Sequence, residues 1–180
     1  MDATAAVPAA GAAAVIDAPG EHTGGAWWFL DTLVVEHRFG TDTGPVVLEV
    51  TLPAGASPPL HVHQDADDSW YVLDGQLVVR CGGREWLAGP GHWVSMPRGV
   101  AHSFRVVGGR AARILIVLAE DSFLRLVREL GQPAAAIGLP VATGGPGMQV
   151  LSRAMAAHDI TTVGASITED EAHAFLNQPR

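Results

Sequence analysis

Residues 27–120 are a succession of short hydrophobic runs separated by turns, and this pattern restricts the fold more than any other feature of the chain. The runs "WWFLDTLVVEHRF" and "VVLEVTLP" are rich in β-branched and aromatic residues, and the turn cluster "GTDTGP" separates them. Further runs follow as far as "ARILIVLAE", with glycine or proline breaks roughly every 8–12 residues. We therefore predict an all-β sandwich or barrel.

After Glu120 the spacing of apolar residues changes to that of helices. The segment "DSFLRLVRELGQP" predicts a helix that begins at Asp121 or Ser122, ends at Gly131 and covers one edge of the barrel. "QPAAAIGLPVATGGPG" is typical of a linker. Two further helices are expected, over residues 148–158 and in "TEDEAHAFL", where a threonine and a glutamate have capping-box spacing. The predicted organisation is a flexible N-terminal arm (1–24), a barrel with its covering helix (25–131), and a linker with a helical tail (132–180).

Composition restricts the classes of partner. Eleven basic residues against 19 acidic ones give a net charge of −8, which argues against nucleic acid. No apolar run reaches the roughly 18 residues that a membrane helix needs, so no membrane partner is expected. Cys81 is the single cysteine and excludes an internal disulfide, and the alanine-rich start carries Asp2 and no basic leader. These features favour a cytoplasmic location.

Three histidines and an aspartate have spacings that suit a metal site on strands. His61 and His63 are two residues apart, so on a strand their imidazoles point to one face and can reach one point. A short loop can return the chain so that Asp68 adds an oxygen, and a turn at residues 97–99 precedes a strand that carries His102. Three nitrogens and one carboxylate suit a first-row transition metal. An isolated HxH pair is also typical of surface or hydrogen-bonded histidines, so the flanking residues decide between the two interpretations.

The flanking glycines and proline have the spacing of the cupin family, which this sequence resembles. The family motifs are G-x5-H-x-H-x(3,4)-E-x6-G and G-x5-P-x-G-x2-H-x3-N. The text around them, "PPLHVHQDADDSWYVLDGQLVV" and "AGPGHWVSMPRGVAHSF", is similar to that of small bacterial single-domain cupins described as quercetin-dioxygenase-like. The resemblance implies a double-stranded β-helix (jelly-roll barrel), here with a short C-terminal helical tail. The matching residues are Gly55, His61, His63, Asp68 and Gly75 in the first block and Gly91, Pro97, Gly99 and His102 in the second.

Two positions depart from the motifs. The final asparagine, which is not a metal ligand in the family, is Val106 here. The glutamate is Asp68, whose carboxylate reaches about 1.3–1.5 Å less because it lacks one methylene. Either the backbone adjusts or a water fills the gap. Asp67 could replace Asp68 if the loop bulges, but the spacing to Gly75 favours Asp68.

A substrate pocket is expected beside the metal. If Asp68 points inward, so do the residues two and four positions later, and the same holds for the residue two positions after His102. A wall of this kind is apolar and aromatic and carries no basic residue, which favours a planar or hydrophobic organic substrate. The same residue types are equally typical of an ordinary core. With a histidine on a strand that can line the mouth in this architecture, the candidate pocket residues are Trp70, Val72, Phe104 and His37.

The resemblance implies a metal-dependent dioxygenase acting on a small aromatic or enolisable organic substrate. The cofactor is expected to be a divalent transition metal (Fe, Ni, Co, Mn or Zn) bound by His61, His63, Asp68 and His102, where it lowers the pKa of a substrate enol. Asp68 inherits the role of catalytic base that the acidic ligand has in related quercetinases. Cupins host many reactions, so the alternatives are a non-oxidative isomerase, cyclase or lyase, or a small-ligand-binding protein without catalysis. Family members of this size often pair through edge strands, which implies a homodimer formed through residues 27–36.

Overall fold

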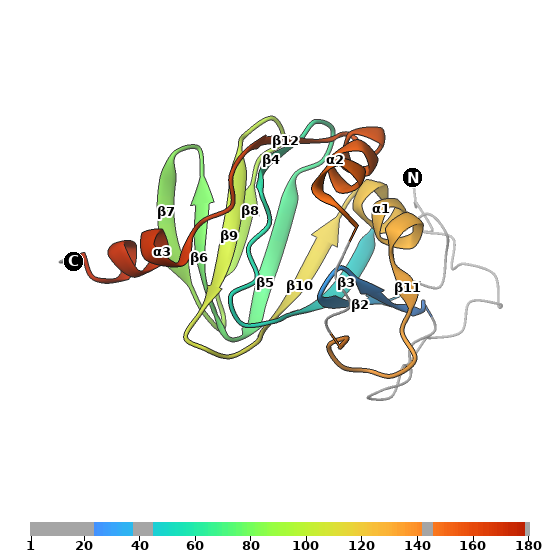
Figure 1. Cartoon of the computed structure of the whole chain (residues 1–180), viewed down its shortest axis with the longest axis horizontal. Coiled ribbons are helices and arrows are strands. Elements are labelled where there is room, and N and C mark those ends of the chain that lie inside the picture. Colours follow the sequence, from blue (N-terminus) through green and yellow to red (C-terminus); the bar gives the residue numbers. More distant parts are fainter. Residues whose placement is uncertain (1–23, 38–44, 142–145, 179–180) are drawn as a thin grey trace, which may run out of the picture.

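The computed structural model describes residues 24–37, 45–141 and 146–178, and within them the chain forms two β-sheets and three helices (Figure 1). The predicted arm of residues 1–24 lies outside the described part of the chain except for Gly24. The strands are β1 (Ala26–Phe29), β2 (Thr32–His37), β3 (Val46–Leu52), β4 (Leu60–His63), β5 (Asp68–Asp74), β6 (Gln76–Cys81), β7 (Arg84–Ala88), β8 (Trp93–Met96), β9 (His102–Val107), β10 (Ala112–Leu118), β11 (Gln132–Pro133) and β12 (Ile160–Gly164), and the helices are α1 (Ser122–Leu130), α2 (Met148–Ala157) and α3 (Glu169–Leu176).

The strands form one sheet in the order β11-β1-β2-β3-β10-β5-β8 and a second in the order β12-β4-β9-β6-β7. Alternating burial along β3 and β10 shows that one face of each strand points to the interior, as the sequence pattern indicated. The core contains residues of both sheets, among them Leu48 and Val72 from the first and Leu77 and Val106 from the second. The predicted all-β architecture is confirmed, and Val106, at the position of the family's asparagine, is a core residue.

The N-terminal run "WWFLDTLVVEHRF" contains two strands joined by a tight turn. β1 pairs with β2 in a hairpin whose two turn residues are Leu30 and Asp31. The hydroxyl of Thr32 donates a hydrogen bond to the carbonyl of Phe29 at 2.7 Å and closes the turn. β1 also pairs with β11 on its other side, so the strand that we expected to offer a free edge for a homodimer is already partly covered. The dimer itself stays a prediction.

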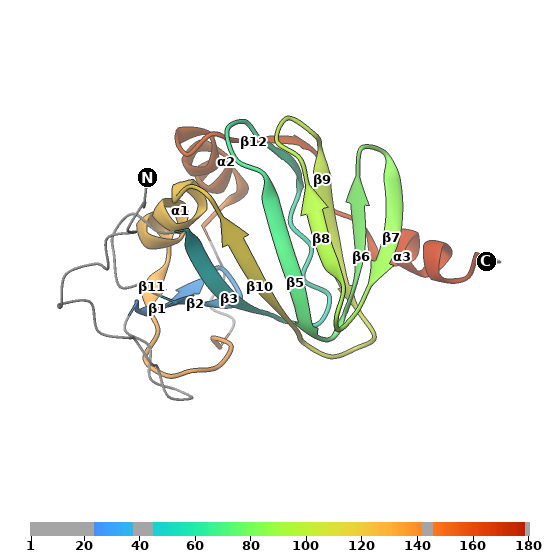
Figure 2. The ribbon, with the colours of Figure 1, turned by 180° about the vertical axis from the view of Figure 1, so that it is seen from behind.

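The three predicted helices are present, with one difference in how they begin. Asp121 precedes α1 but its side chain makes no capping bond to the helix, and it pairs with Arg125 at 2.6 Å instead. α1 lies beside α2 and contacts β1, next to the edge strand β11 of the first sheet (Figures 1 and 2). α3 begins with the expected capping box, in which Thr168 and Glu171 bond reciprocally to each other's backbone.

The C-terminal tail is more than helical, because it adds a strand that the sequence analysis did not predict. β12 extends the second sheet by pairing with β4, and its Ile160 lies opposite His63 while Thr162 lies opposite His61. Beyond it, Ile167 packs with residues of α3 against the outer face of this sheet. The tail therefore forms part of the barrel wall next to the predicted metal ligands. The domain boundaries given above stay predictions.

None of the helices in the described ranges has both the length and the apolar character needed to cross a membrane.

Candidate functional site

The register of two strands brings three histidines together. Burial alternates along β4 so that His61 and His63 point inward while their neighbours are half-exposed. β9 pairs with β4 so that His102 lies directly opposite His61. The ring centroids of His61 and His102 are 4.5 Å apart, and that of His63 lies 5.2 Å from each of them. The three imidazoles that the spacing predicted on one face therefore converge inside the barrel.

The turn before β9 fixes this register, and it requires a glycine. Gly99 donates its backbone N–H to the carbonyl of His63 at 2.8 Å, which ties the turn to the end of β4. Its φ is +74°, a left-handed conformation that other residues adopt at a cost. The predicted turn at residues 97–99 is thus found where the second motif places it, three residues before His102.

The hydrogen bonds of two histidines determine which ring nitrogen is available. Nδ1 of His61 lies 2.8 Å from the carbonyl of Pro59, and Nδ1 of His102 lies 2.9 Å from the carbonyl of Val100. A carbonyl only accepts, so both Nδ1 atoms carry the proton and both Nε2 atoms keep a lone pair. Among the described residues, Nε2 of His102 is the buried side-chain polar atom that has no hydrogen-bond partner. A buried, unpaired lone pair facing two other imidazoles is the arrangement expected of a metal ligand.

Burial keeps these imidazoles neutral. Loss of solvation, followed by repulsion from His102, lowers the pKa of His61 to about 4. Loss of solvation, followed by repulsion from the other two rings, lowers the pKa of His63 to about 3. Burial also lowers the pKa of His102. All three are therefore neutral at pH 7, the form that binds a metal cation.

Asp68 comes from the other sheet and lies beside the histidines. It is the first residue of β5, buried, with Oδ2 at 3.7 Å from Nε2 of His102. Its Oδ1 accepts a hydrogen bond of 2.6 Å from the indole N–H of Trp70. Burial raises the pKa of Asp68 to about 7, and the bond from Trp70 opposes this shift.

The expected four-residue ligand set is found in part. One ligand atom from each of His61, His63 and His102 lies within 4.8 Å of the others, and Asp68 is not in this group. First-row metals bind imidazole nitrogen at about 2.0–2.1 Å, so nitrogens around one ion are at most about 4.2 Å apart. A small movement of the rings brings the three histidines within this limit. Ligation by Asp68 stays a prediction.

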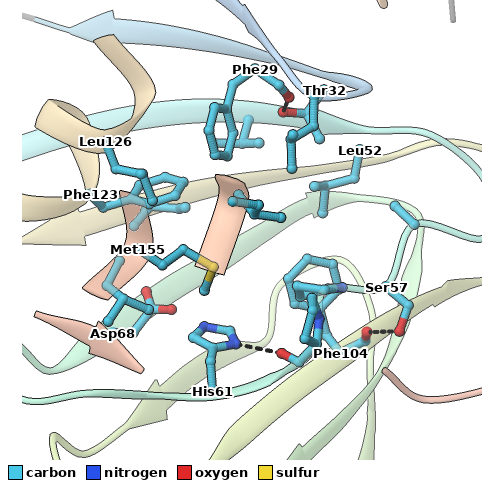
Figure 3. Close-up of a pocket in the computed structure, with 18 of the residues that line it drawn as sticks. Phe29, Thr32, Leu52, Ser57, His61, Asp68, Phe104, Phe123, Leu126 and Met155 are labelled. Carbon is cyan, nitrogen blue, oxygen red and sulfur yellow. Dashed lines mark hydrogen bonds between the residues drawn. The ribbon is translucent and has the colours of Figure 1, made fainter. Parts of the chain in front are cut away.

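A cavity of about 320 Å³ opens from this cluster (Figure 3). Two candidate pocket residues, Trp70 and Phe104, line it, and their rings meet edge to face at 5.1 Å across the two sheets. The expectation for the other two is corrected. Val72 is fully buried in the core and does not line the cavity, while His37 is partly exposed on β2 with Nε2 3.8 Å from Glu49. Val72 lies two residues after Trp70 on β5, beyond the end of the cavity. The side chain of His37 lies on the face of β2 opposite to the inward-facing residues.

Part of the cavity lining comes from outside residues 48–118 and was not predicted from the sequence. Phe123 and Leu126 of α1, three residues of α2 and Ile160 of β12 all face the cavity. The β-branched run "ITTVG" after the second predicted helix was a signal for β12, but its pairing partner is about 100 residues earlier in the chain. The helical spacing of α1 identified an apolar face without indicating what that face covers.

Residues 48–118 match the model of the cupin domain family. The chain is also 31% identical over 96 residues to quercetin 2,3-dioxygenase of Bacillus subtilis, a match that covers 52% of this chain and 28% of that protein. The chain thus spans little more than a quarter of the length of this curated relative. Solved structures that resemble it include the Cnp3 cupin domain of Schizosaccharomyces pombe (22% identical, 57% of this chain and 74% of that chain, TM-score 0.45) and KdgF from Halomonas sp. (18%, 52% and 86%, TM-score 0.46).

Proposed function

The barrel of this chain is a cupin domain, and from this premise we propose that the protein is a metal-dependent dioxygenase acting on a small aromatic or enolisable organic substrate. One observation carries the proposal. Three buried, neutral imidazoles converge at one end of an apolar cavity, with a buried carboxyl group beside them. The oxidative part of the proposal is supported by the similarity to the Bacillus quercetin 2,3-dioxygenase.

The three histidines would hold the metal, His61 and His102 through their Nε2 atoms. The carbonyls of Pro59 and Val100 keep the rings of His61 and His102 oriented and hold the ring protons on Nδ1. A bound divalent metal would lower the pKa of a substrate enol or hydroxyl group and neutralise the resulting anion.

Asp68 is placed to accept the substrate proton. Its Oδ2 lies 3.7 Å from Nε2 of His102, and Trp70 occupies Oδ1, which leaves Oδ2 for the substrate. The edge-to-face contact of Trp70 with Phe104 holds the indole in place. Apolar side chains make up most of the remaining wall and exclude water from the reacting group.

A non-oxidative reaction, such as an isomerisation or elimination, is the second candidate. The observation that favours it is that Asp68 lies outside the group formed by the three histidines, so it can move a substrate proton whether or not the metal binds dioxygen. A ligand-binding protein without catalysis is the third, and turnover of any substrate would exclude it.

Metal analysis of the purified protein tests whether the three histidines bind a metal. We expect about one equivalent of a first-row metal in the parent protein, a loss of most of it in His61→Ala, and full retention in His173→Ala, because His173 is exposed on α3. Asp68→Ala shows whether the carboxylate is a ligand. If the parent protein holds no metal after supplementation with Fe, Ni, Co, Mn or Zn, the metal-dependent proposal is wrong.

Oxygen uptake separates the dioxygenase from the non-oxidative enzyme. The metal-loaded protein is mixed with a flavonol in an oxygen-electrode cell, and we expect consumption of dioxygen that Asp68→Asn slows at least about 100-fold, because general-base catalysis contributes roughly 10²–10⁴-fold. Substrate turnover without oxygen consumption would favour the isomerase or lyase instead.

A further inference from the structure

The cavity has two chemically different ends. The polar end is formed by His61, His63 and Asp68, all within the residues that match the cupin family. The rest of the lining is mostly apolar and comes both from strands within that match and from segments outside it, namely the β1–β2 turn, α1, α2 and β12. Figure 3 shows this separation, with His61 and Asp68 at one side and Phe29 and Thr32 at the other. The residues that match the cupin family supply the polar end, and the segments outside the match supply about half of the remaining lining residues.

The lining offers no positive charge to the body of a substrate. Among the described residues that line the cavity there is no lysine or arginine. Among the described lining residues outside the polar end, the one charged residue is Asp31, which is exposed. An anionic group bound away from the histidines would lose its hydration without gaining a partner and would face Asp31. The cavity therefore favours a substrate whose body is uncharged.

Met155 lies where the apolar part of the cavity meets the polar end. It is buried on α2, and Figure 3 shows its side chain extending into the cavity toward His61, near Phe123. The hydroxyl of Thr162 on β12 contacts its sulfur at 3.9 Å. A methionine side chain is apolar, unbranched and adaptable, so it can follow the surface of a flat or elongated apolar molecule.

Leu30 lies at the other end and is held there by a strained backbone. Its φ is +56°, in the left-handed region that a branched apolar residue rarely adopts. Turns of this length ordinarily place glycine or asparagine at such a position. Leu30 instead packs its side chain against the core and lines the cavity. Strain that persists at a cavity wall indicates that the side chain is needed there.

We propose that Leu30 and Met155 determine substrate specificity by contacting the uncharged, apolar body of a substrate whose oxygen-bearing end faces the three histidines. This inference rests on the proposed function for the position of the polar end of the substrate. It does not depend on which reaction follows or on whether dioxygen is consumed.

Two fluorescent probes that share one aromatic skeleton and differ by a sulfonate group test the charge selection. The full-length protein, as purified, is titrated with the neutral probe N-phenylnaphthylamine and with its sulfonated analogue anilinonaphthalenesulfonate. We expect saturable binding of the neutral probe and at least about tenfold weaker binding of the anion. No saturable binding of the neutral probe, or equal binding of the two, would overturn the inference.

Variants of Met155 test the contact near the histidines. Met155→Gln keeps the length of the side chain but adds a buried amide, and should weaken binding of the neutral probe about tenfold. Met155→Leu, which conserves apolar character, should stay within about twofold of the parent protein. Val150→Gln places the same amide on the exposed side of α2 and should change nothing. Unchanged affinity in Met155→Gln would refute the role of this residue.

Leu30→Gly tests the far end of the cavity. It removes a half-buried side chain but relieves backbone strain, so the two effects on stability offset each other, while affinity for the neutral probe should fall roughly fivefold. Asp159→Gly is the matched control, because Asp159 also has a left-handed φ (+61°) but does not line the cavity. A folded Leu30→Gly protein that binds the probe as tightly as the parent would overturn the role of Leu30. If only the proposed function is wrong, the protein will hold no metal but will still bind the neutral probe more tightly than the anionic one.

Discussion

Replacing Trp70 by phenylalanine should raise the pKa of Asp68 further above its ordinary range. The indole N–H donates to Oδ1 of Asp68 at 2.6 Å and favours the charged form of a carboxyl group that burial otherwise keeps protonated up to about pH 7. A hydrogen bond to a charged group contributes about 1.5–3 kcal/mol, and each pKa unit corresponds to about 1.4 kcal/mol. In Trp70→Phe the pKa of Asp68 should therefore be higher than in the parent protein by about one to two pH units.

The change has a defined consequence for stability. The pKa of Asp68 is raised in the folded state, so the folded protein holds this proton more tightly than the unfolded chain does. The contribution of Asp68 to stability therefore falls as the pH rises from about 4 to about 7, where in the parent protein it levels off. In Trp70→Phe the fall should continue to about pH 8–9 and cost a further 1–3 kcal/mol or so. At pH 7 and above the three buried histidines are neutral, whereas below about pH 6.5 they contribute a slope of the opposite sign.

Two measurements on the metal-free protein test this reasoning. Urea unfolding at pH 7 and pH 9 gives the stability difference, and carbon NMR of the labelled carboxyl group gives the pKa of Asp68 directly. Trp93→Phe is the control, because Trp93 is exposed on β8 and should leave both results unchanged. An identical pH dependence in Trp70→Phe and the parent protein, or a lower pKa of Asp68, would refute the role assigned to the indole.

Three further predictions concern stability and can be measured by chemical or thermal unfolding. The lowered pKa of His63 means that the metal-free protein loses stability as the pH falls below about 6.5. In His63→Gln the loss of stability between pH 6.5 and pH 5 should be smaller by about 2 kcal/mol. An unchanged dependence of stability on pH would contradict this role of His63. Ile160→Ala should cost about 2–4 kcal/mol, because Ile160 is buried in β12 opposite His63, whereas Thr161→Ala on the exposed face should cost little. Gly75→Ala should cost at least about 2 kcal/mol, since its φ is +80° and a Cβ would lie 2.6 Å from Ala112; a neutral result would mean that the turn can rearrange.

Several features of the site were predictable because they depend on neighbours in the chain. Alternation along a strand places His61 and His63 on one face whatever the strand pairs with. The glycine at position 99 and the proline before it define a turn, and the turn sets where the strand of His102 begins. The same local rules predicted the helices, including the capping box of α3.

Other features could not be read from local pattern, because they depend on which distant segments meet. Val72 shares the inward face of β5 with Trp70, but the cavity ends before it, and only packing across the two sheets decides that. The reach of Asp68 depends on the separation of the sheets, which here leaves its carboxyl group bonded to Trp70 and outside the group of three histidines. Alternation determines which way a side chain points but not what it meets.

The sequence by itself determined the all-β architecture, the inward-facing histidines and the apolar character of their surroundings, since backbone geometry and hydrophobic spacing act over a few residues. Only the tertiary structure decided the limits of the cavity, because they are set by contacts across about 100 residues of sequence, such as that of Ile160 with the strand of His63. The loss of chain entropy on closing such a contact is recovered only when both surfaces are buried together, so neither segment alone carries the signal.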